Sequence, residues 1–69
     1  MKVGNTVYYA LDWYDEDSEG NVVDEGIAVI KGDSDEELYE EVKKVEAMHT
    51  GFFIRPAYDS EVLEAFGTI

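Results

Sequence analysis

The sequence predicts a small α+β fold, a single-layer antiparallel sheet with one helix packed on one face. Alternating apolar and polar residues over 6–14 and 22–31 are typical of strands, whereas the apolar residues of 35–49 recur at helical spacing. The chain has 69 residues, so we expect one domain spanning 1–69. Its hydrophobic content of 45% and aromatic content of 13% favour a folded core over disorder.

The first two strands are expected to form a β-hairpin. In TVYYALDWY, residues 6–14, β-branched and aromatic side chains alternate between two faces. VVDEGIAVIK, residues 22–31, has the composition of a second strand in which Gly26 is a candidate bulge. Between them DEDSEGN, residues 15–21, is rich in turn-forming residues, which indicates a long hairpin tip.

Residues 35–49 are expected to form the main helix. Ser34 and Glu37 have the S-x-x-E spacing of a capping box, and the first turn is acidic, as the helix dipole favours. Gly51 stands where a glycine commonly ends a helix. The apolar positions at helical spacing are Leu38, Val42 and Val45.

The last third of the chain predicts a third strand and one short element. FFIRPAY, residues 52–58, is aromatic and extended, and Pro56 restricts it to an edge because proline cannot donate a ladder hydrogen bond. Residues 59–69 are typical of a short C-terminal helix that ends at Gly67, with a short strand as the alternative.

One helix can cover only one face of this sheet. We expect it to cover Tyr9 and Leu11 together with Ile27 and Val29. An exposed antiparallel face is normally polar, yet the remaining face is mostly apolar, which indicates cover by the C-terminal turns, by a partner or by a second copy in a homodimer. The residues expected on this partner or dimer face are Tyr8, Ala10, Tyr14, Val22, Ala28 and Ile30.

The charge balance restricts the classes of partner. Seventeen acids oppose five bases, for a net charge of −12. Self-repulsion opposes compaction, so salt and mild acid are expected to stabilise the fold. Direct binding to nucleic acid or to an anionic membrane is disfavoured, because both need clustered Lys and Arg. A basic partner is favoured.

Two groups of acids, in the hairpin tip and on the helix, are candidates for contacting a basic protein such as a nucleic-acid-binding enzyme. Acting as a DNA mimic or inhibitor, they would take the place of phosphates. A solvated surface that serves solubility and an adaptation to high salt are the alternatives. In size, acidity and hairpin-plus-helix order the chain resembles small bacteriophage proteins that inhibit host DNA-processing enzymes, although no motif is shared. The candidate acids are Asp15, Asp17, Glu19, Asp35, Glu36, Glu37, Glu40 and Glu41.

The hairpin tip also matches half of a calcium loop. Asp15, Asp17 and Glu19 stand at alternate positions, which suits hard oxygen ligands, and Gly20 allows the turn. The match ends at the twelfth position, where Gly26 replaces the required glutamate. A solvated hairpin tip is therefore expected, and a divalent-cation site is the alternative.

Nothing in the sequence indicates catalysis. The single histidine, His49, is expected to act as a cation beside the carbonyls that end the helix, and the chain has no cysteine. No nucleophile–base pair and no cofactor motif is recognised, so we expect a protein that is not an enzyme. Arg55, alone among acids and aromatics, is expected to pair with a carboxylate. The absence of a signal-peptide pattern and of long apolar runs predicts a cytoplasmic location without membrane contact.

Overall fold

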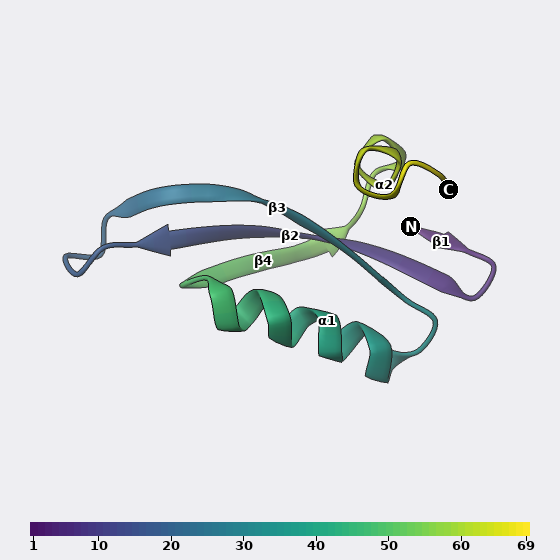
Figure 1. Ribbon diagram of the computed structural model, residues 1–69, viewed down its shortest axis with the longest axis horizontal. Coiled ribbons are helices and arrows are strands. Elements are labelled where there is room, and N and C mark those ends of the chain that lie inside the picture. The colour runs from purple at the N-terminus through teal and green to yellow at the C-terminus, as the bar shows by residue number, and fades with distance from the viewer.

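The computed structural model describes residues 1–69 and confirms the α+β class (Figure 1). Four strands form one antiparallel sheet, and two helices pack against it. No helix has the length and apolar character needed to cross a bilayer. In chain order the elements are β1 (Lys2–Val3), β2 (Thr6–Glu16), β3 (Val22–Gly32), α1 (Asp35–Met48), β4 (Gly51–Pro56) and α2 (Asp59–Phe66).

Strand β2 is the centre of the sheet. Along one edge it pairs with β3 over nearly its whole length. Along the other edge it pairs first with β1, next to Thr6 and Val7, and then with β4 between Tyr9 and Tyr14. The sequence did not predict β1, a two-residue strand that turns into β2 through Gly4 at φ +61°. The outer edges of β3 and β4 have no neighbouring strand.

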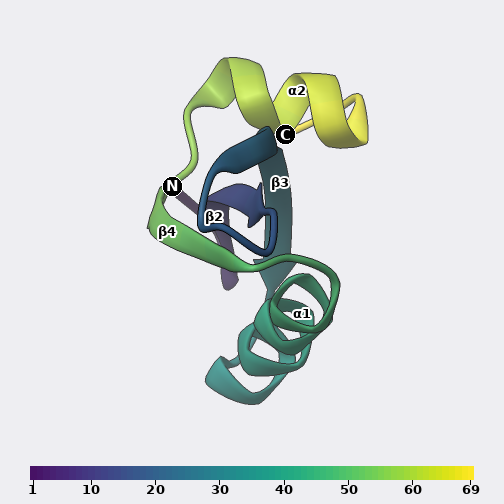
Figure 2. The same ribbon diagram turned by 90° about the vertical axis from the view of Figure 1, so that its left-hand side faces the viewer.

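The two helices lie on opposite faces of the sheet, α1 below and α2 above in Figure 2. Under α1 the buried residues are Leu11, Ile30 and Val45. Under α2 the buried cluster joins the sheet to Val62 of the helix, which is fully inaccessible. The C-terminal segment is therefore a helix, and the alternative of a strand is wrong. The cluster beneath α2 consists of Tyr8, Ala10, Ala57 and Val62.

The assignment of β3 residues to faces was wrong by one position. Leu11 pairs with Ala28 and Tyr9 pairs with Ile30, so Ala28 and Ile30 lie on the α1 face and not on the partner face expected for them. Ile27 therefore points to the α2 side. Because side chains alternate along a strand, a one-residue change of register exchanges the faces of every residue. The irregularity at Asp15/Glu16 beside the hairpin tip sets this register, and sequence alternation does not reveal it.

Helix α1 begins as predicted and ends differently. Ser34 Oγ accepts a hydrogen bond from the Glu37 N–H at 3.2 Å, and Glu37 Oε2 accepts one from the Asp33 N–H at 2.6 Å. The first bond is the N-cap half of a capping box, whereas the second reaches Asp33, the residue before the N-cap, and not Ser34 itself. At the other end the cap residue is His49, whose N–H donates to the carbonyl of Val45. The expectation that Gly51 ends the helix was wrong, because this glycine begins β4.

The molecule is elongated and has a small core. Its extents are 44 × 25 × 16 Å and its radius of gyration is 12.9 Å, compared with about 11 Å for a compact chain of this length. Its accessible surface is 4755 Å², compared with about 4400 Å² expected from its mass. Only 8 of 69 residues are buried. Much apolar surface therefore remains available for contacts with other molecules.

Candidate functional site

The acids of the hairpin tip serve the turn itself. Asp17 Oδ1 accepts hydrogen bonds from the backbone N–H groups of Glu19 at 2.9 Å and Asn21 at 3.0 Å. These bonds, led by the one from Asn21, lower the pKa of Asp17 because they favour the charged carboxylate. Gly20 completes the turn at φ +83°. Asp17 is therefore folded onto its own loop, whereas the Glu19 side chain is exposed and accepts no hydrogen bond.

Asp15 joins the hairpin to the end of α1. Its carboxylate oxygens lie 3.1 and 3.2 Å from Nδ1 of His49, and Oδ1 also accepts the Thr50 N–H at 3.2 Å. The His49 ring is stacked on Trp13, with centroids 3.8 Å apart and an angle of 14° between the planes. His49 therefore pairs with Asp15, and this replaces the simple role of a cation beside helix carbonyls that was expected for it.

Trp13 lies in the sheet where Gly26 faces it. A Cβ atom at Gly26 would be 2.4 Å from Cζ2 of Trp13, so only glycine leaves room for the indole. Gly26 pairs with Trp13 in regular register, which corrects its interpretation as a bulge. The Asp15–His49 pair has the form of a carboxylate orienting a histidine base. The pair links β2 to the residue that ends α1, and the His49 ring is stacked on Trp13.

The candidate cation ligands of the hairpin tip do not converge. Asp15 is directed at His49 and Asp17 at the backbone of its own turn, so they do not converge with Glu19. No group of three or more His, Asp and Glu side chains in the chain is arranged to hold a metal ion. The three weak cation candidates therefore do not form one ligand group, since Asp15 and Asp17 each bond elsewhere in the chain.

The acids of α1 divide into bound and free groups. Glu37 accepts the Asp33 N–H, Glu40 lies 3.8 Å from Lys43, and Glu41 lies 3.1 Å from Lys44. Both ion pairs are exposed and so contribute little to stability. The exposed acids of the first turn that form no side-chain hydrogen bond or ion pair are Asp35 and Glu36.

The two acidic groups lie at opposite ends of the molecule. In Figure 1 the hairpin tip between β2 and β3 is at the far left, whereas α1 begins at the right. The long axis measures 44 Å. The acids therefore form no single cluster; they are spread along an elongated body.

The predicted apolar partner face is only partly open. Tyr8 and Ala10 are buried beneath α2, so their assignment to a partner surface was wrong. Beyond the end of α2 the same face remains uncovered: Ile27 is 55% and Phe53 70% exposed. Tyr14 is half-buried, with its ring centroid 6.0 Å from that of Phe53. The open apolar patch is smaller than the sequence indicated and lies nearer the hairpin tip.

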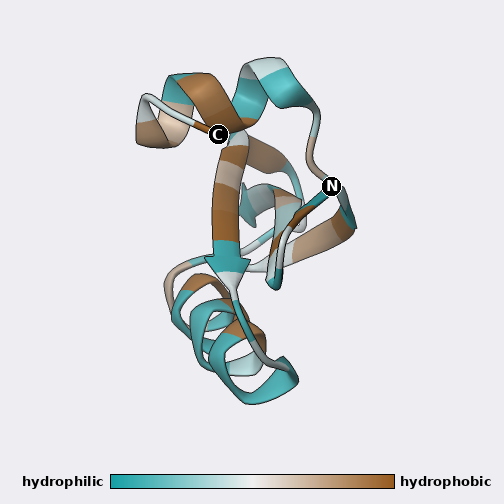
Figure 3. Ribbon diagram, turned by 90° about the vertical axis from the view of Figure 1, so that its right-hand side faces the viewer, coloured by the Kyte–Doolittle hydropathy of each residue, from teal (hydrophilic) through white to brown (hydrophobic).

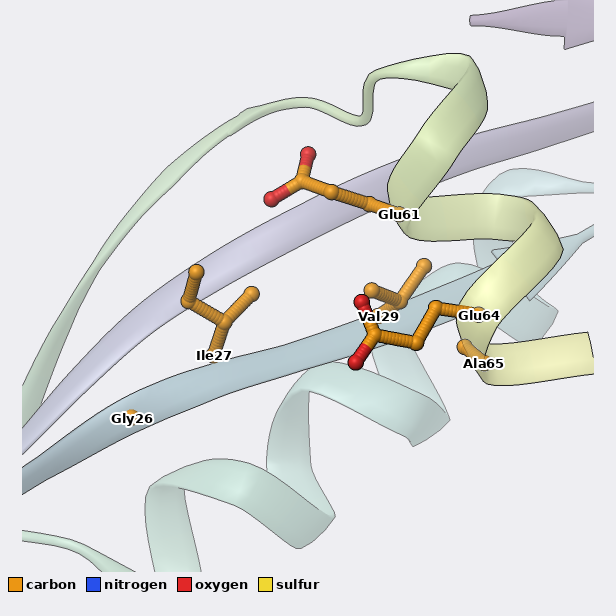
Figure 4. Close-up of a pocket in the computed structure, with 6 residues that line it drawn as sticks. All are labelled: Gly26, Ile27, Val29, Glu61, Glu64 and Ala65. Atoms are coloured by element: carbon orange, nitrogen blue, oxygen red, sulfur yellow. The ribbon is translucent and has the colours of Figure 1, made fainter.

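A shallow hollow lies between β3 and α2 (Figure 4). Its volume is about 420 Å³, and it is open to solvent. Ile27 and Val29 form its apolar floor, and Glu61 and Glu64 project into it from α2. The floor of the hollow is therefore apolar, and its side formed by α2 is acidic.

Arg55 fastens α2 to the sheet. Its Nη1 and Nη2 donate to the two oxygens of Glu61 at 2.7 and 2.6 Å, and its Nε donates to Asp12 Oδ2 at 3.0 Å. The expectation that Arg55 pairs with a carboxylate is confirmed. The hydrogen bonds from Arg55, followed by one from the backbone of Tyr58, lower the pKa of Glu61 to about 2. The Glu61 carboxylate in turn raises the pKa of Arg55. Glu61 and Asp12 were not singled out in the sequence, where only the isolation of Arg55 pointed to such a pair.

Comparison of the chain with protein-family models, with curated proteins and with solved structures found no match.

Proposed function

We propose that the chain is a non-enzymatic binding module whose carboxylates engage a basic protein surface. The observation that carries this proposal is the large excess of acids that no cation of the chain neutralises. Only five of the seventeen acids contact a cationic side chain or the histidine. These five are Asp12, Asp15, Glu40, Glu41 and Glu61.

The free acids are distributed in a way that suits an extended basic surface. Glu19 lies at the hairpin tip, and Asp35 and Glu36 lie at the start of α1, near opposite ends of a body 44 Å long. A nucleic-acid-binding protein presents Lys and Arg side chains along a similar length of groove. Occupation of such a groove by this chain would exclude the nucleic acid, which is the action of an inhibitor or DNA mimic. Long-range attraction would mainly raise the association rate.

Two features support a role without catalysis. The single histidine is stacked on Trp13 and bonded to Asp15, a carboxylate that also accepts the Thr50 N–H. The surface hollows are all open to solvent, which does not provide the dry, preorganised environment that strengthens electrostatic catalysis.

Affinity capture tests the proposal. Immobilised chain is exposed to cell lysate at about 0.1 M and about 1 M NaCl, and duplex DNA is then added as a competitor. We expect basic proteins to be retained at low salt, and to be released both by high salt and by DNA. Failure to retain any basic protein, or retention that neither salt nor DNA reverses, would contradict the proposal.

A pair of matched variants locates the contact. Asp35→Asn with Glu36→Gln removes two free charges from α1, and Glu40→Gln with Glu41→Gln removes two charges that Lys43 and Lys44 already offset. Both double variants change the net charge equally. We expect the first to reduce retention more than the second. Equal losses would mean that net charge alone, and not the placement of the free acids, governs binding.

A further inference from the structure

The outer edge of β3 is the longest unpaired edge of the sheet. Strand β3 runs from Val22 to Gly32 and pairs only with β2. Figure 3 shows it as a largely hydrophobic band that passes between α2 above and α1 below. A long, apolar, unpaired edge offers a row of backbone donors and acceptors to another strand. The free acids named for the proposed function, Glu19, Asp35 and Glu36, lie outside this strand.

The hydrogen bonds of β2 show which β3 residues direct their backbone N–H and C=O groups away from the sheet, toward the open edge. The carbonyl of Tyr14 accepts from the Thr50 N–H and the carbonyl of Tyr8 accepts from the Ala57 N–H, both on the β4 side. Backbone groups alternate in direction along a strand, so the residues between them, such as Tyr9 and Leu11, are bonded to β3 instead.

The residues of β3 opposite those positions, Ile30 and Ala28, therefore use their backbone groups within the sheet. The alternate residues Glu25, Ile27, Val29 and Lys31 direct their backbone N–H and C=O groups toward the open edge. The Glu25 N–H agrees with this direction, because it is bonded to the side chain of Asp24 at 2.9 Å and not to a strand.

We propose that β3 pairs with β3 of a second copy of this chain, in an antiparallel register centred on Ala28. In that register Ile27 lies opposite Val29 of the second copy, and Glu25 lies opposite Lys31 of the second copy. Twofold symmetry repeats both pairs. In each of the four resulting residue pairs the backbone N–H and C=O groups are directed at the other copy. This allows about eight new backbone hydrogen bonds, two for each pair.

The neighbouring registers lack this complementarity. The outward backbone groups of the two copies can pair only when the twofold axis is centred on a residue of β3. The neighbouring registers are therefore centred on Ile27 and on Val29. A centre at Ile27 places Glu25 opposite Val29, and a centre at Val29 places Ile27 opposite Lys31. Both leave a charge facing an aliphatic side chain. Only the Ala28 centre matches charge with opposite charge and apolar with apolar residue.

The environment of Lys31 is a second argument for the register centred on Ala28. Lys43, Lys44 and Arg55 each contact a carboxylate of their own chain. Lys31 contacts none, although acids outnumber bases by 17 to 5. Its ammonium group lies 4.8 Å from the ring centroid of Phe66, on the α2 side of the sheet. In the dimer it would meet Glu25 of the second copy on that side.

Pairing would also cover apolar surface that the monomer leaves open. Ile27 is 55% exposed, and it contributes with Val29 to the floor of the hollow beside α2. The opposing factor is the charge of −12 on each copy. Salt would screen this repulsion, so dimerisation should strengthen with ionic strength, whereas binding to a basic partner should weaken. The two proposals can therefore fail separately.

Analytical ultracentrifugation of the purified chain, from micromolar to millimolar concentration, tests the dimer. The expected result is a mass that rises from 7.8 kDa toward twice that value, with tighter association at about 0.5 M NaCl than at low salt. A sample that stays monomeric at millimolar concentration in high salt would overturn the proposal.

Charge reversal tests the register. Lys31→Glu and Glu25→Lys should each weaken the dimer on the order of tenfold, because two attractive pairs become repulsive. The double variant, which exchanges the two charges, should restore most of the affinity. Lys2→Glu is the control for Lys31→Glu, since it changes the net charge equally from β1, on the other side of β2. Circular dichroism confirms that each variant is folded.

The apolar pair is tested in the same assay. Ile27→Asp should abolish association, whereas Phe53→Asp, a change at an even more exposed residue on the same face but on β4, should leave it intact. A dimer that survives Lys31→Glu or Ile27→Asp, or a charge exchange that fails to rescue a folded double variant, would show that copies meet through a different surface.

Discussion

Arg55 of β4 and Glu61 of α2 form a two-pronged ion pair, with N···O distances of 2.6 and 2.7 Å. Glu61 also accepts the Tyr58 N–H at 2.9 Å, which completes the start of α2. One carboxylate therefore both caps the helix and fastens it to the sheet. Tyr8 and Ala10 are buried beneath the helix that this ion pair joins to the sheet.

Removing the attachment should loosen α2. Arg55→Lys keeps the positive charge but cannot donate to both oxygens of Glu61 and to Asp12 together. We expect the melting temperature to fall by about 5 °C, a measurable shift for a domain of this size. Lys44→Gln, which removes an exposed ion pair from α1, is the control and should change it little. Equal shifts in the two variants would show that Arg55 has no special role.

The pH dependence of stability should show the same contact. The pKa of Glu61 is lowered from 4.5 to about 2 by folding. A lowered pKa stabilises the folded state above the unfolded value, and this stabilisation is lost as the pH falls from 4.5 toward 2. In urea titrations the midpoint of the unmodified chain should therefore lose ground to that of Glu61→Gln over this range. Parallel pH profiles for the two proteins would contradict this assignment.

Salt should stabilise the fold, because most of the seventeen acids lack a cationic partner. Raising NaCl from low concentration to about 0.5 M shortens the screening length to a few ångströms and so reduces repulsion. The melting temperature should rise, and it should rise less in Asp35→Asn with Glu36→Gln, which carries two fewer charges. Measurement at low protein concentration separates this effect from association. A melting temperature that does not respond to salt would refute the prediction.

Gly26→Ala should displace Trp13. The added Cβ would lie 2.4 Å from Cζ2 of the indole, so the ring must move and lose its stacking on His49. We expect a loss of about 1–3 kcal/mol of unfolding free energy and a change in tryptophan fluorescence. Val23→Ala, at an exposed position of the same strand, should cost less than about 0.5 kcal/mol. Unchanged fluorescence in Gly26→Ala would show that the contact is loose.

The predictions that succeeded came from short-range patterns. Alternation located β2 and β3, the capping box at Ser34 located the start of α1, and Pro56 stands at the end of β4, an edge strand. These signals depend on residues two to four positions apart, so a linear sequence contains them. The excess of acids is likewise a property of composition, and it is sufficient to favour a basic partner.

The predictions that failed concerned residues distant in sequence. The exchange of faces for Ala28 and Ile30 arose from the register between β2 and β3, which the hairpin tip sets. For Tyr8 and Ala10 the sequence left cover by the C-terminal turns, by a partner or by a second copy open, and the structure shows that α2 covers them. Asp15 is bonded to His49, which is 34 positions away, and no local pattern indicates this contact.

Local sequence therefore decided which segments are helix and strand, where α1 begins, and that the surface is strongly acidic, since each depends on near neighbours or on composition. Tertiary packing alone decided which side chains share a face, which acids remain free, and which strand edge stays open. The physical reason is that strand register and helix docking are set by the free energy of the whole assembled sheet, in which a shift of one residue exchanges buried and exposed side chains along an entire strand.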